Sequence, residues 1–254
     1  MEAVDAISKA VTLIRSARNL AAFTGAGIST ASGIPDFRSP NSGLWEAADP
    51  MLVASIFGFR ANPGAFFDWV RPLAKTILDA KPNPAHMALA HLERIGILKA
   101  VITQNIDMLH QRAGNQIVYE LHGHFREATC THCFRTFDGE AILQEFLRSR
   151  DIPRCDTCNS VLKPNVILFG EQLPIQALRH AQDAAKQADV LLIIGSSLEV
   201  APASEIPLLA RRHGAKIVII NLEQTLMDGD ADVVFHQDAA QLLPELIRGL
   251  EQAN

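Results

Sequence analysis

The feature that most constrains the fold of this chain is a regular alternation of short apolar runs with stretches of helical periodicity. Helical spacing of apolar residues marks residues 4–14, 84–95 and 201–212. The apolar runs predict buried strands at residues 20–23, 99–102, 190–194, 216–220 and 232–235. Apolar strands that alternate with helices form a parallel sheet covered on both faces. We therefore predict an α/β fold, with a Rossmann-like parallel sheet and helices on both of its faces.

The segment at residues 125–164 breaks this alternation, and it contains all four cysteines. They form two CxxC pairs with 21 residues between them, slightly more than the usual range of about 15 to 20. Two such pairs can place four thiolates tetrahedrally around one zinc ion, which leaves no open position for catalysis. A redox-active pair is the competing interpretation, but two matched pairs favour a metal. The predicted ligands of a structural zinc are Cys130, Cys133, Cys155 and Cys158.

This segment is predicted to be a small zinc-ribbon module inserted in a larger domain. Residues 1–124 and 165–254 would form the Rossmann-like domain, residues 125–164 would form the module, and together they would make one catalytic unit. The 254 residues are 48% hydrophobic and 20% charged, which is ordinary for a soluble globular protein with a large core.

Charge and cysteine usage limit the expected partners and location. The formal net charge is −5 and no run of Lys and Arg occurs, so we expect no direct nucleic-acid partner. No apolar segment approaches membrane-spanning length, and the amino terminus lacks a basic start followed by an apolar stretch. The paired cysteines suit a metal in a reducing compartment. We therefore expect a cytoplasmic monomer without a membrane partner.

A glycine-rich run, GAGIST at residues 25–30, follows the first predicted strand. Small residues there let backbone N–H groups approach a pyrophosphate near a helix amino terminus. The run is not the usual GxGxxG fingerprint, and no acidic residue ends a second strand about 20 residues later. A tight turn without a ligand explains the glycines about as well, so the run alone leaves both interpretations open.

Further segments make the signal specific. They are GIPDFR at 33–38, TQNID at 103–107, HG at 122–123, KPNVILFGE at 163–171, GSSLEV at 195–200 and NLE at 221–223. In this order, with the cysteine pairs between HG and FGE, the chain resembles the sirtuin family of NAD-dependent protein deacylases, and most closely its compact bacterial and archaeal members. The resemblance extends over residues 17–246. Lys163 and Ser196 stand where the family often has Arg and Thr, and neither change removes a group needed for chemistry.

The resemblance implies NAD-dependent removal of acetyl groups from lysine side chains of acylated proteins or peptides, with longer uncharged acyl groups as further candidates. Nicotinamide and O-acyl-ADP-ribose would be released. In the family mechanism the acyl carbonyl oxygen attacks the anomeric carbon of the ribose, and a histidine then activates the 2′ hydroxyl. His122 is the predicted general base, because an imidazole with a pKa of about 6.5 is available in its neutral form. Asn105 is the other predicted catalytic residue.

The resemblance also assigns the site for NAD. Ile106 and Asp107 would bind the nicotinamide carboxamide, Phe37 would shield the emptied pocket, and Arg38 would approach the phosphates. The predicted NAD-binding residues are Gly25, Ala26, Gly27, Thr30, Asp36, Phe37, Arg38, Gln104, Asn105, Ile106, Asp107, Gly195, Ser196, Ser197, Asn221, Glu223 and Ala239. For residues 103–107 the alternative interpretation is a strand end followed by a helix cap.

The run at residues 166–170 carries the expected substrate site. If it is extended, Ile167 and Phe169 share one face, which would line an apolar tunnel for the acylated lysine, while Val166 and Leu168 face the core. In the family the substrate backbone adds as a strand between the FGE loop and the segment after GSS. The predicted substrate contacts are Ile167, Phe169, Gly170, Glu171, Leu198 and Val200.

The acyl group is expected to be uncharged. Family members that prefer succinyl or malonyl lysine carry a Tyr and an Arg near the tunnel mouth, and alignment on the NP step puts Val70 and Leu73 at those positions. Arg71 would point away from the tunnel as a surface residue. His86 and His110 lie in helical sequence and are expected to be ordinary packing or surface residues.

Other functions than deacylation are also compatible with parts of this sequence. A mono-ADP-ribosyltransferase or an NAD hydrolase would share the NAD site and His122, but the intact FGE and GSSLEV segments favour a peptide cleft and hence deacylation. A catalytically silent NAD sensor and a zinc-ribbon adaptor are the alternatives outside enzymes. The full set of nicotinamide-pocket residues argues against both.

Overall fold

The structure is a computed structural model that describes residues 2–36 and 48–252. Its largest element is a six-stranded sheet in the order β3-β2-β1-β7-β8-β9, and every neighbouring pair of strands is parallel. The strands are β1 (Leu20–Thr24), β2 (Leu98–Thr103), β3 (Val118–Glu120), β7 (Val190–Ile194), β8 (Lys216–Ile220) and β9 (Val233–Phe235). The sheet confirms the predicted fold class, and every strand except β3 overlaps a predicted apolar run.

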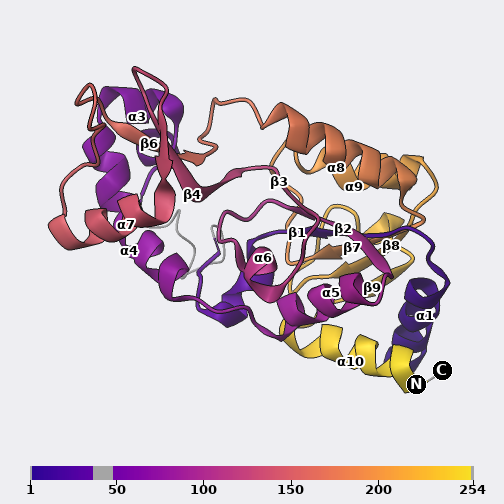
Figure 1. The fold of residues 1–254 in the computed structure, drawn as a ribbon. Coiled ribbons are helices and arrows are strands. Elements are labelled where there is room, and N and C mark those ends of the chain that lie inside the picture. The colour runs from indigo at the N-terminus through magenta and orange to yellow at the C-terminus, as the bar shows by residue number, and fades with distance from the viewer. Residues whose placement is uncertain (1, 37–47, 253–254) are drawn as a thin grey trace.

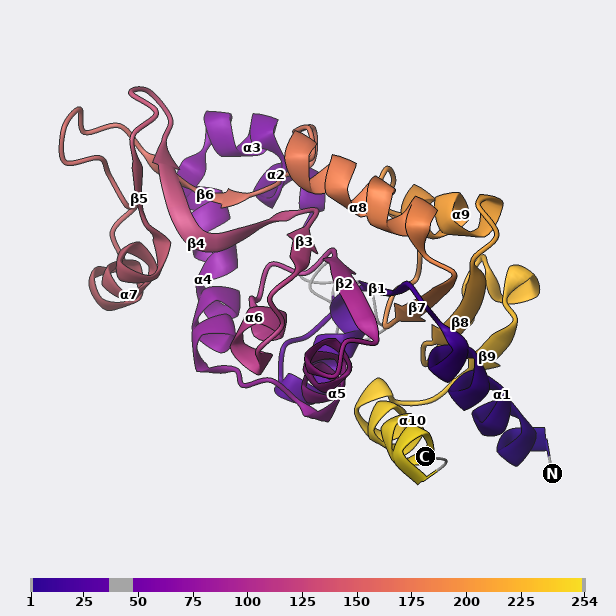
Figure 2. The ribbon, with the colours of Figure 1, turned by 45° about the vertical axis from the view of Figure 1, so that its right-hand side comes forward.

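Helices cover both faces of this sheet, as Figures 1 and 2 show. On one face lie α1 (Glu2–Ser16), α5 (Pro84–Arg94) and α10 (Ala239–Gln252), and on the other lie α8 (Ile175–Gln187) and α9 (Glu205–Arg212). Each layer has its own apolar cluster, represented by Leu89 on the first face and Ile206 on the second. All residues of β1 and β7 are buried, because these strands are covered on both sides.

β3 and the start of α9 differ from the sequence prediction. β3 is not predicted, because it has only three residues, of which Val118 and Tyr119 are only partly buried and Glu120 is charged. α9 begins at Glu205, whereas helical periodicity suggests a start at residue 201, since residues 201–204 form turns. The predicted helix at 84–95 agrees with α5 to within one residue.

A smaller antiparallel sheet, in the order β5-β4-β6, lies beside the parallel sheet (Figure 2). Its elements are β4 (Gly123–Cys130), β5 (Thr136–Asp138) and β6 (Leu162–Val166), with α7 (Gly139–Ser149) between the last two. β4 follows β3 almost directly along the chain. The chain therefore passes from one sheet to the other at Leu121 and His122.

Helices from the first third of the chain share an apolar cluster with this smaller sheet. They are α3 (Ile56–Ala61) and α4 (Pro63–Asp79), and the short α2 (Pro50–Val53) packs on these two helices. The rings of Phe67 on α4 and Phe146 on α7 meet edge to face with centroids 5.1 Å apart, within a cluster that also contains Phe125 of β4. The sequence leaves this packing undecided, because an amphipathic helix does not specify which surface covers its apolar face.

Arg71 on α4 strengthens the same contact. It donates hydrogen bonds to the carbonyl oxygens of Phe146 and Arg150, each at 3.1 Å, and its guanidinium lies over the Phe146 ring. Its side chain is only 21% exposed. Arg71 thus lies in the contact between α4 and α7, and the prediction that it is a surface residue is wrong.

Among the described residues, the other helical elements are α6 (Leu109–Ala113) and the 3-10 helices Ala26–Ser32 and Asp228–Asp230. Within the described ranges, none of the helices combines the length and the apolar character that crossing a bilayer would require.

Candidate active site

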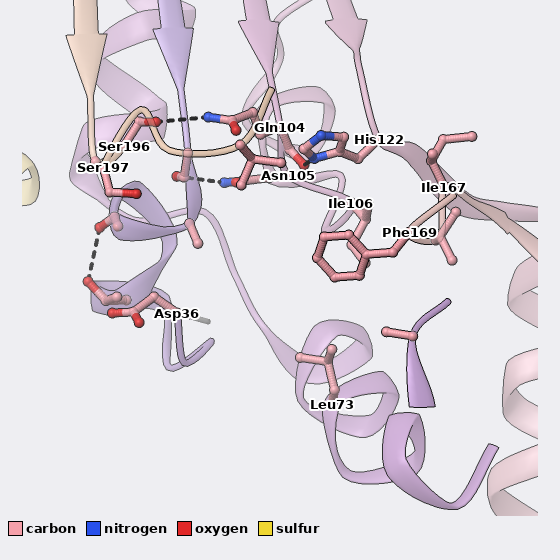
Figure 3. Close-up of a pocket in the computed structure, with 18 of the residues that line it drawn as sticks. Asp36, Leu73, Gln104, Asn105, Ile106, His122, Ile167, Phe169, Ser196 and Ser197 are labelled. Carbon is pink, nitrogen blue, oxygen red and sulfur yellow. Dashed lines mark hydrogen bonds between the residues drawn. The ribbon is translucent and has the colours of Figure 1, made fainter. Parts of the chain in front are cut away.

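A cavity of about 370 Å³ opens at the carboxyl ends of the parallel strands. Its wall comes from the segments that follow β1, β2, β7 and β8, and from α4 and the end of β6 (Figure 3). Ligands of open parallel sheets bind at this end of the strands. The predicted site residues that line it are Gly25, Ala26, Gly27, Thr30, Asp36, Gln104, Asn105, Ile106, His122, Ile167, Phe169, Gly170, Glu171, Gly195, Ser196, Ser197, Val200, Asn221, Glu223 and Ala239. Phe37 and Arg38 lie outside the described residues.

The glycine-rich run packs tightly against the loop after β7. A Cβ atom added to Gly25 would lie 2.7 Å from the carbonyl oxygen of Gly195, and one added to Gly27 would lie 2.8 Å from the Gly195 Cα. The amides of Gly25 and Gly27 donate to the carbonyl oxygens of Ile194 and Gly195, at 3.0 and 2.9 Å. Because both amide hydrogens are used in these bonds within the protein, these two amides do not point to a pyrophosphate as the sequence suggested. The glycines are required by the contact between two loops.

A buried hydrogen-bond network follows the ends of β1 and β2. The Asn105 side chain is 9% exposed, and its Nδ2 donates to the Gly25 carbonyl oxygen at 3.0 Å and to Ser29 Oγ at 3.1 Å. Ser29 Oγ in turn donates to Asp107 Oδ2 at 2.7 Å. Both amide hydrogens of Asn105 are thus used, which leaves Asn105 Oδ1 as an acceptor.

Asp107 lies at the inner end of this network. It is 4% exposed, and its Oδ1 accepts from the Leu109 amide at 2.9 Å, in the turn before α6, whose N-cap residue is Met108. Burial raises the pKa of Asp107 above its ordinary value, while the hydrogen bonds from Leu109 and Ser29 oppose this change. A second cavity of about 20 Å³ borders Asp107 and Ser29 and shares Asn105 and Ile106 with the main cavity.

His122 occupies the joint between the two sheets and lines the main cavity. Its Nδ1 lies 3.0 Å from the carbonyl oxygen of Gln104. A carbonyl oxygen only accepts, so Nδ1 carries the proton in the neutral ring and Nε2 is left as the acceptor. Burial lowers the pKa of His122 below 6.5, and the hydrogen bond to Gln104 partly opposes this shift. The imidazole is therefore neutral at pH 7.

Gly123 allows this placement. Its φ is +74°, and an added Cβ atom would lie 2.0 Å from the carbonyl oxygen of Asn165 on the neighbouring strand. A side chain at this position would push β4 away from β6 and would move His122 with it.

The run after β6 alternates as the sequence predicts. Val166 and Leu168 are 4% and 5% exposed and belong to the core, whereas Phe169 is 37% exposed on the opposite face with Ile167 (Figure 3). The Glu171 carboxylate accepts from Lys163 Nζ and from the Leu168 amide, both at 2.9 Å. The Glu171 carboxylate therefore fixes the conformation of the loop, and Lys163 stabilises the carboxylate through the ion pair.

Leu198, a predicted substrate contact, has a buried side chain. Its side chain is 5% exposed and packs in the apolar cluster with residues such as Leu121 and Ile193. The side chain is a core residue, so any contact of this residue with a substrate would have to come from its backbone.

The far end of the cavity is formed by the segments after β8 and β9. The Asn221 amide donates to the Phe235 carbonyl oxygen at 3.0 Å, and Asn221 Nδ2 donates to the Glu223 carbonyl oxygen at 2.8 Å. These bonds fix the turn that brings Asn221 and Glu223 to the cavity, together with Ala239 at the start of α10.

Several residues of this site are not predicted from the sequence. Ser29 stands within the GAGIST run, and its buried hydroxyl links Asn105 to Asp107. Phe66, Trp69 and Phe125 add apolar surface to the cavity wall. Ser29 has a local signal in the run itself, but the aromatic residues come from distant segments and no local pattern identifies them.

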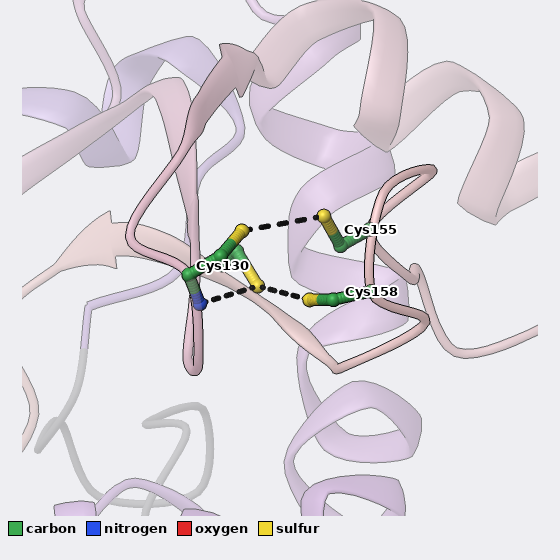
Figure 4. Close-up of side chains that lie close together, drawn as sticks. Cys130, Cys155 and Cys158 are labelled. Atoms are coloured by element: carbon green, nitrogen blue, oxygen red, sulfur yellow. Dashed lines mark hydrogen bonds between the residues drawn. The ribbon is translucent and has the colours of Figure 1, made fainter.

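The four cysteines form a separate cluster at the outer end of the smaller sheet, where sulfur atoms from the two CxxC pairs face one another (Figure 4). Their Sγ atoms all lie within 4.8 Å of one another. The separations are 3.4 Å between Cys130 and Cys158 and 3.7 Å between Cys133 and Cys155. Four sulfurs bound at about 2.3 Å around a tetrahedral zinc would be about 3.8 Å apart. The donor set therefore fits zinc.

Known proteins share the whole of this architecture. Residues 25–202 match the sequence model of the Sir2 family. NAD-dependent protein deacylase 2 of Archaeoglobus fulgidus is 47% identical over 98% of this chain and 97% of its own length. NAD-dependent protein deacetylase of Sulfolobus acidocaldarius is 46% identical, with 99% and 98% covered.

Solved structures of related proteins have the same fold. One from a study of the mechanism and regulation of Sir2 enzymes superposes with a TM-score of 0.93 at 46% identity, with 100% of both chains covered. A Sir2 complex with a p53 peptide and NAD+ superposes with a TM-score of 0.87 at 41% identity over 95% of this chain and 97% of that one. From its sequence, its fold and the arrangement of its cleft, the chain belongs to the Sir2 family.

Proposed function

We propose that this protein is an NAD-dependent deacylase that removes acetyl and longer uncharged acyl groups from lysine side chains of acylated proteins or peptides. The observation that carries the proposal is the composition of one cavity. It joins His122, the buried Asn105 network and the apolar face of Ile167 and Phe169. The names of relatives at 43–47% identity, NAD-dependent protein deacetylase or deacylase, support it. So does the relative solved with a propionylated peptide.

His122 acts as the general base in this proposal. Its Nε2 is the free acceptor, and the lowered pKa keeps it neutral, so it can take a proton from a hydroxyl group brought into the cavity. Asn105 presents Oδ1 as an acceptor beside it. Both groups are held by backbone carbonyl oxygens, which fixes their orientation before a ligand arrives.

The polar wall would bind NAD, which as co-substrate supplies the leaving nicotinamide and the ribose that receives the acyl group. Asp107 and Ile106 would hold the carboxamide, and Ser29 would keep the Asp107 carboxylate in place. Phe37 would shield the emptied pocket and Arg38 would approach the phosphates. Ser196 and Ser197 would contact the adenosine half of the dinucleotide, with Gly195 beside them. Asn221, Glu223 and Ala239 would lie at its adenosine end.

The apolar wall would take the acylated lysine. Val70 and Leu73 are 2% and 4% exposed and line the cavity from α4, together with Phe66 and Trp69. Arg71, which lies between them in sequence, is turned toward α7 and hydrogen-bonds there. A charged acyl group would therefore meet apolar side chains, and an unpaired buried carboxylate costs several kcal/mol.

The cysteine cluster would hold one structural zinc, which cross-links the two loops. Residues 125–164 would form the zinc-ribbon module within a single catalytic unit, with residues 1–124 and 165–254 as the Rossmann-like domain. We also propose that the protein is a monomer in the cytoplasm and that it has no direct nucleic-acid partner. The pairing of all four thiols in one metal-binding cluster suits a reducing compartment.

The test is incubation with NAD and an acetylated peptide, with free lysine, nicotinamide and O-acetyl-ADP-ribose measured together. We expect nicotinamide release to depend on the acetylated peptide, because its carbonyl oxygen is the attacking group in the proposed mechanism. The same peptide with unmodified lysine is the control. Equal NAD turnover with and without the acetylated peptide would assign the cavity to an NAD hydrolase.

A further inference from the structure

The chain crosses from the parallel sheet to the smaller sheet in two residues, one of which is His122. On the first side, the Leu121 amide donates to the Thr103 carbonyl oxygen at 2.9 Å. On the second side, the Ile167 amide donates to the His122 carbonyl oxygen at 2.8 Å. In Figure 2, β4 runs from the end of β3 away from the parallel sheet. A change in the angle between the sheets would therefore move the imidazole.

The strand after this joint is irregularly paired. β4 pairs with β6 at Gly123 and again from Ala128 onward, and the register shifts between these two positions. An irregular ladder fixes a strand less firmly than a continuous one, and shifts of this kind bend the strand. In this stretch Phe125 is buried in the apolar cluster and Glu127 pairs with Asp138 of β5, so a side-chain contact back to β3 would add a restraint on the angle between the two sheets.

A two-pronged ion pair supplies that restraint. Arg126 lies in the irregular stretch, and both its terminal nitrogens donate to the carboxylate of Glu120, the last residue of β3, with Nη1 at 2.7 Å from Oε1. Gln111 of α6 also donates to Glu120 Oε1, at 2.8 Å. The Glu120 side chain is 8% exposed, and that of Arg126 is 42% exposed. A bidentate pair fixes orientation as well as distance.

The pair brackets His122 along the chain, with Glu120 two residues before it and Arg126 four residues after it. We propose that Arg126 is a positioning residue, whose contact with Glu120 holds β4 against the end of β3 and so keeps His122 Nε2 directed into the cavity. The inference rests on the proposed function, in which His122 is the base. Arg126 itself does not line the cavity as the described residues form it, so its effect would be indirect.

This role predicts an unequal effect on the two halves of the reaction. Release and re-addition of nicotinamide do not require the base, whereas formation of O-acyl-ADP-ribose does. Displacement of a catalytic group by about 1 Å can cost about 100-fold in rate. A general loss of stability would instead lower both activities together, because both would follow the amount of folded protein.

The experiment compares Arg126→Met and Arg126→Lys with the wild-type enzyme, measuring nicotinamide exchange, kcat for O-acyl-ADP-ribose, and KM for NAD and peptide. For Arg126→Met we expect kcat to fall about 10-fold or more, with exchange and both KM values within about twofold of wild type. Arg126→Lys should recover part of kcat, since an ammonium group can make one strong contact but not the fork. Arg148→Met is the matched control, because it breaks an exposed arginine pair with Glu145 on α7 and should leave every rate unchanged.

An unchanged kcat in Arg126→Met, or an equal fall in exchange and product formation, would overturn the inference. If the Met variant does not fold, the same ratio is read from Arg126→Lys: a several-fold selective fall in product formation supports the role, and wild-type rates overturn it. A wild-type enzyme that forms no O-acyl-ADP-ribose would instead overturn the proposed function.

Discussion

The two sides of the cleft are stabilised in different ways. The parallel sheet lies between two large apolar clusters, and its central strands β1 and β7 are wholly buried. Among the residues the structure describes, the cluster around the cysteines has only four buried members, Ala128, Cys130, Cys155 and Leu162. Two of these four residues are predicted zinc ligands. Hydrophobic burial can stabilise the first side by itself. The second side combines a separate aromatic cluster, which contains Phe67, Phe125 and Phe146, with this cysteine end, and only the cysteine end depends on zinc. The cleft nevertheless takes its polar wall from the first side and much of its apolar wall from the second.

Removal of zinc should have the largest effect, and it should affect only one side of the cleft. We expect chelation, or Cys130→Ala, to unfold the cysteine module and abolish deacylation, because binding of a structural zinc is coupled to folding of its site. The parallel sheet should persist, since its core does not involve the cysteines. Thermal melts, far-UV circular dichroism and activity measure the three effects, and added zinc should restore the chelated protein. Full activity and an unchanged melt in metal-free protein would show that the apolar wall is independent of the metal.

His122 lies at the junction of the two sides, so its substitution separates chemistry from stability. We expect His122→Ala to lower product formation by about 10²- to 10⁴-fold, the usual contribution of a general base. The melting temperature should stay close to that of wild type, and nicotinamide exchange should survive. His124→Ala is the control, because His124 follows two residues later on β4 and is only partly buried. Deacylation that is unchanged in His122→Ala would remove the residue from the mechanism.

Acyl selectivity tests the apolar wall alone. On one peptide, we expect kcat/KM for acetyl or butyryl lysine to exceed that for succinyl lysine by about 10-fold or more, because the succinyl carboxylate would be buried without a cation. The double variant Val70→Tyr with Leu73→Arg should narrow this ratio, since it adds a hydroxyl and a guanidinium to the cavity wall. A wild-type value for succinyl equal to or above that for acetyl would require a cation at the wall.

Low pH should lower the stability of the parallel-sheet side, and this is the smallest of the expected effects. His86 and His110 are 0% and 1% exposed, with ring centroids 4.9 Å apart. Burial lowers the pKa of His86 from 6.5 to about 4, and burial, then the neighbouring His86, lower that of His110. Below pH 6.5 the unfolded chain thus binds protons that the folded protein does not. Stability is fully present above pH 6.5 and falls as the pH drops toward 4, by about 1 kcal/mol from His86 alone at pH 5.5.

The measurement is the free energy of urea unfolding at pH 7.5 and 5.5 for wild type and His86→Gln. The variant should lose less stability between the two pH values, because it removes one group that titrates only in the unfolded chain. Protonation of the cysteines contributes equally to both proteins and cancels in the comparison. An identical pH dependence would show that His86 is not the source of the acid sensitivity.

Local sequence was a sufficient guide wherever one segment decides the outcome. Apolar runs gave the positions of five strands of the parallel sheet, β1, β2, β7, β8 and β9, because a strand covered on both faces must be apolar along its length. The spacing of the cysteines predicted a cluster whose geometry fits zinc. The alternation at residues 166–170 separated core from cavity face, because successive strand residues point to opposite sides.

Tertiary structure decided whatever depends on which distant surfaces meet. It put α4 against α7, turned Arg71 away from the cavity, and buried Leu198 in the core. It also used the amides of Gly25 and Gly27 for loop packing and joined Ser29 to Asp107. These outcomes share one physical reason. A residue type and its local spacing set which face of an element is apolar, but the partner that covers that face is chosen by the packing of the whole chain.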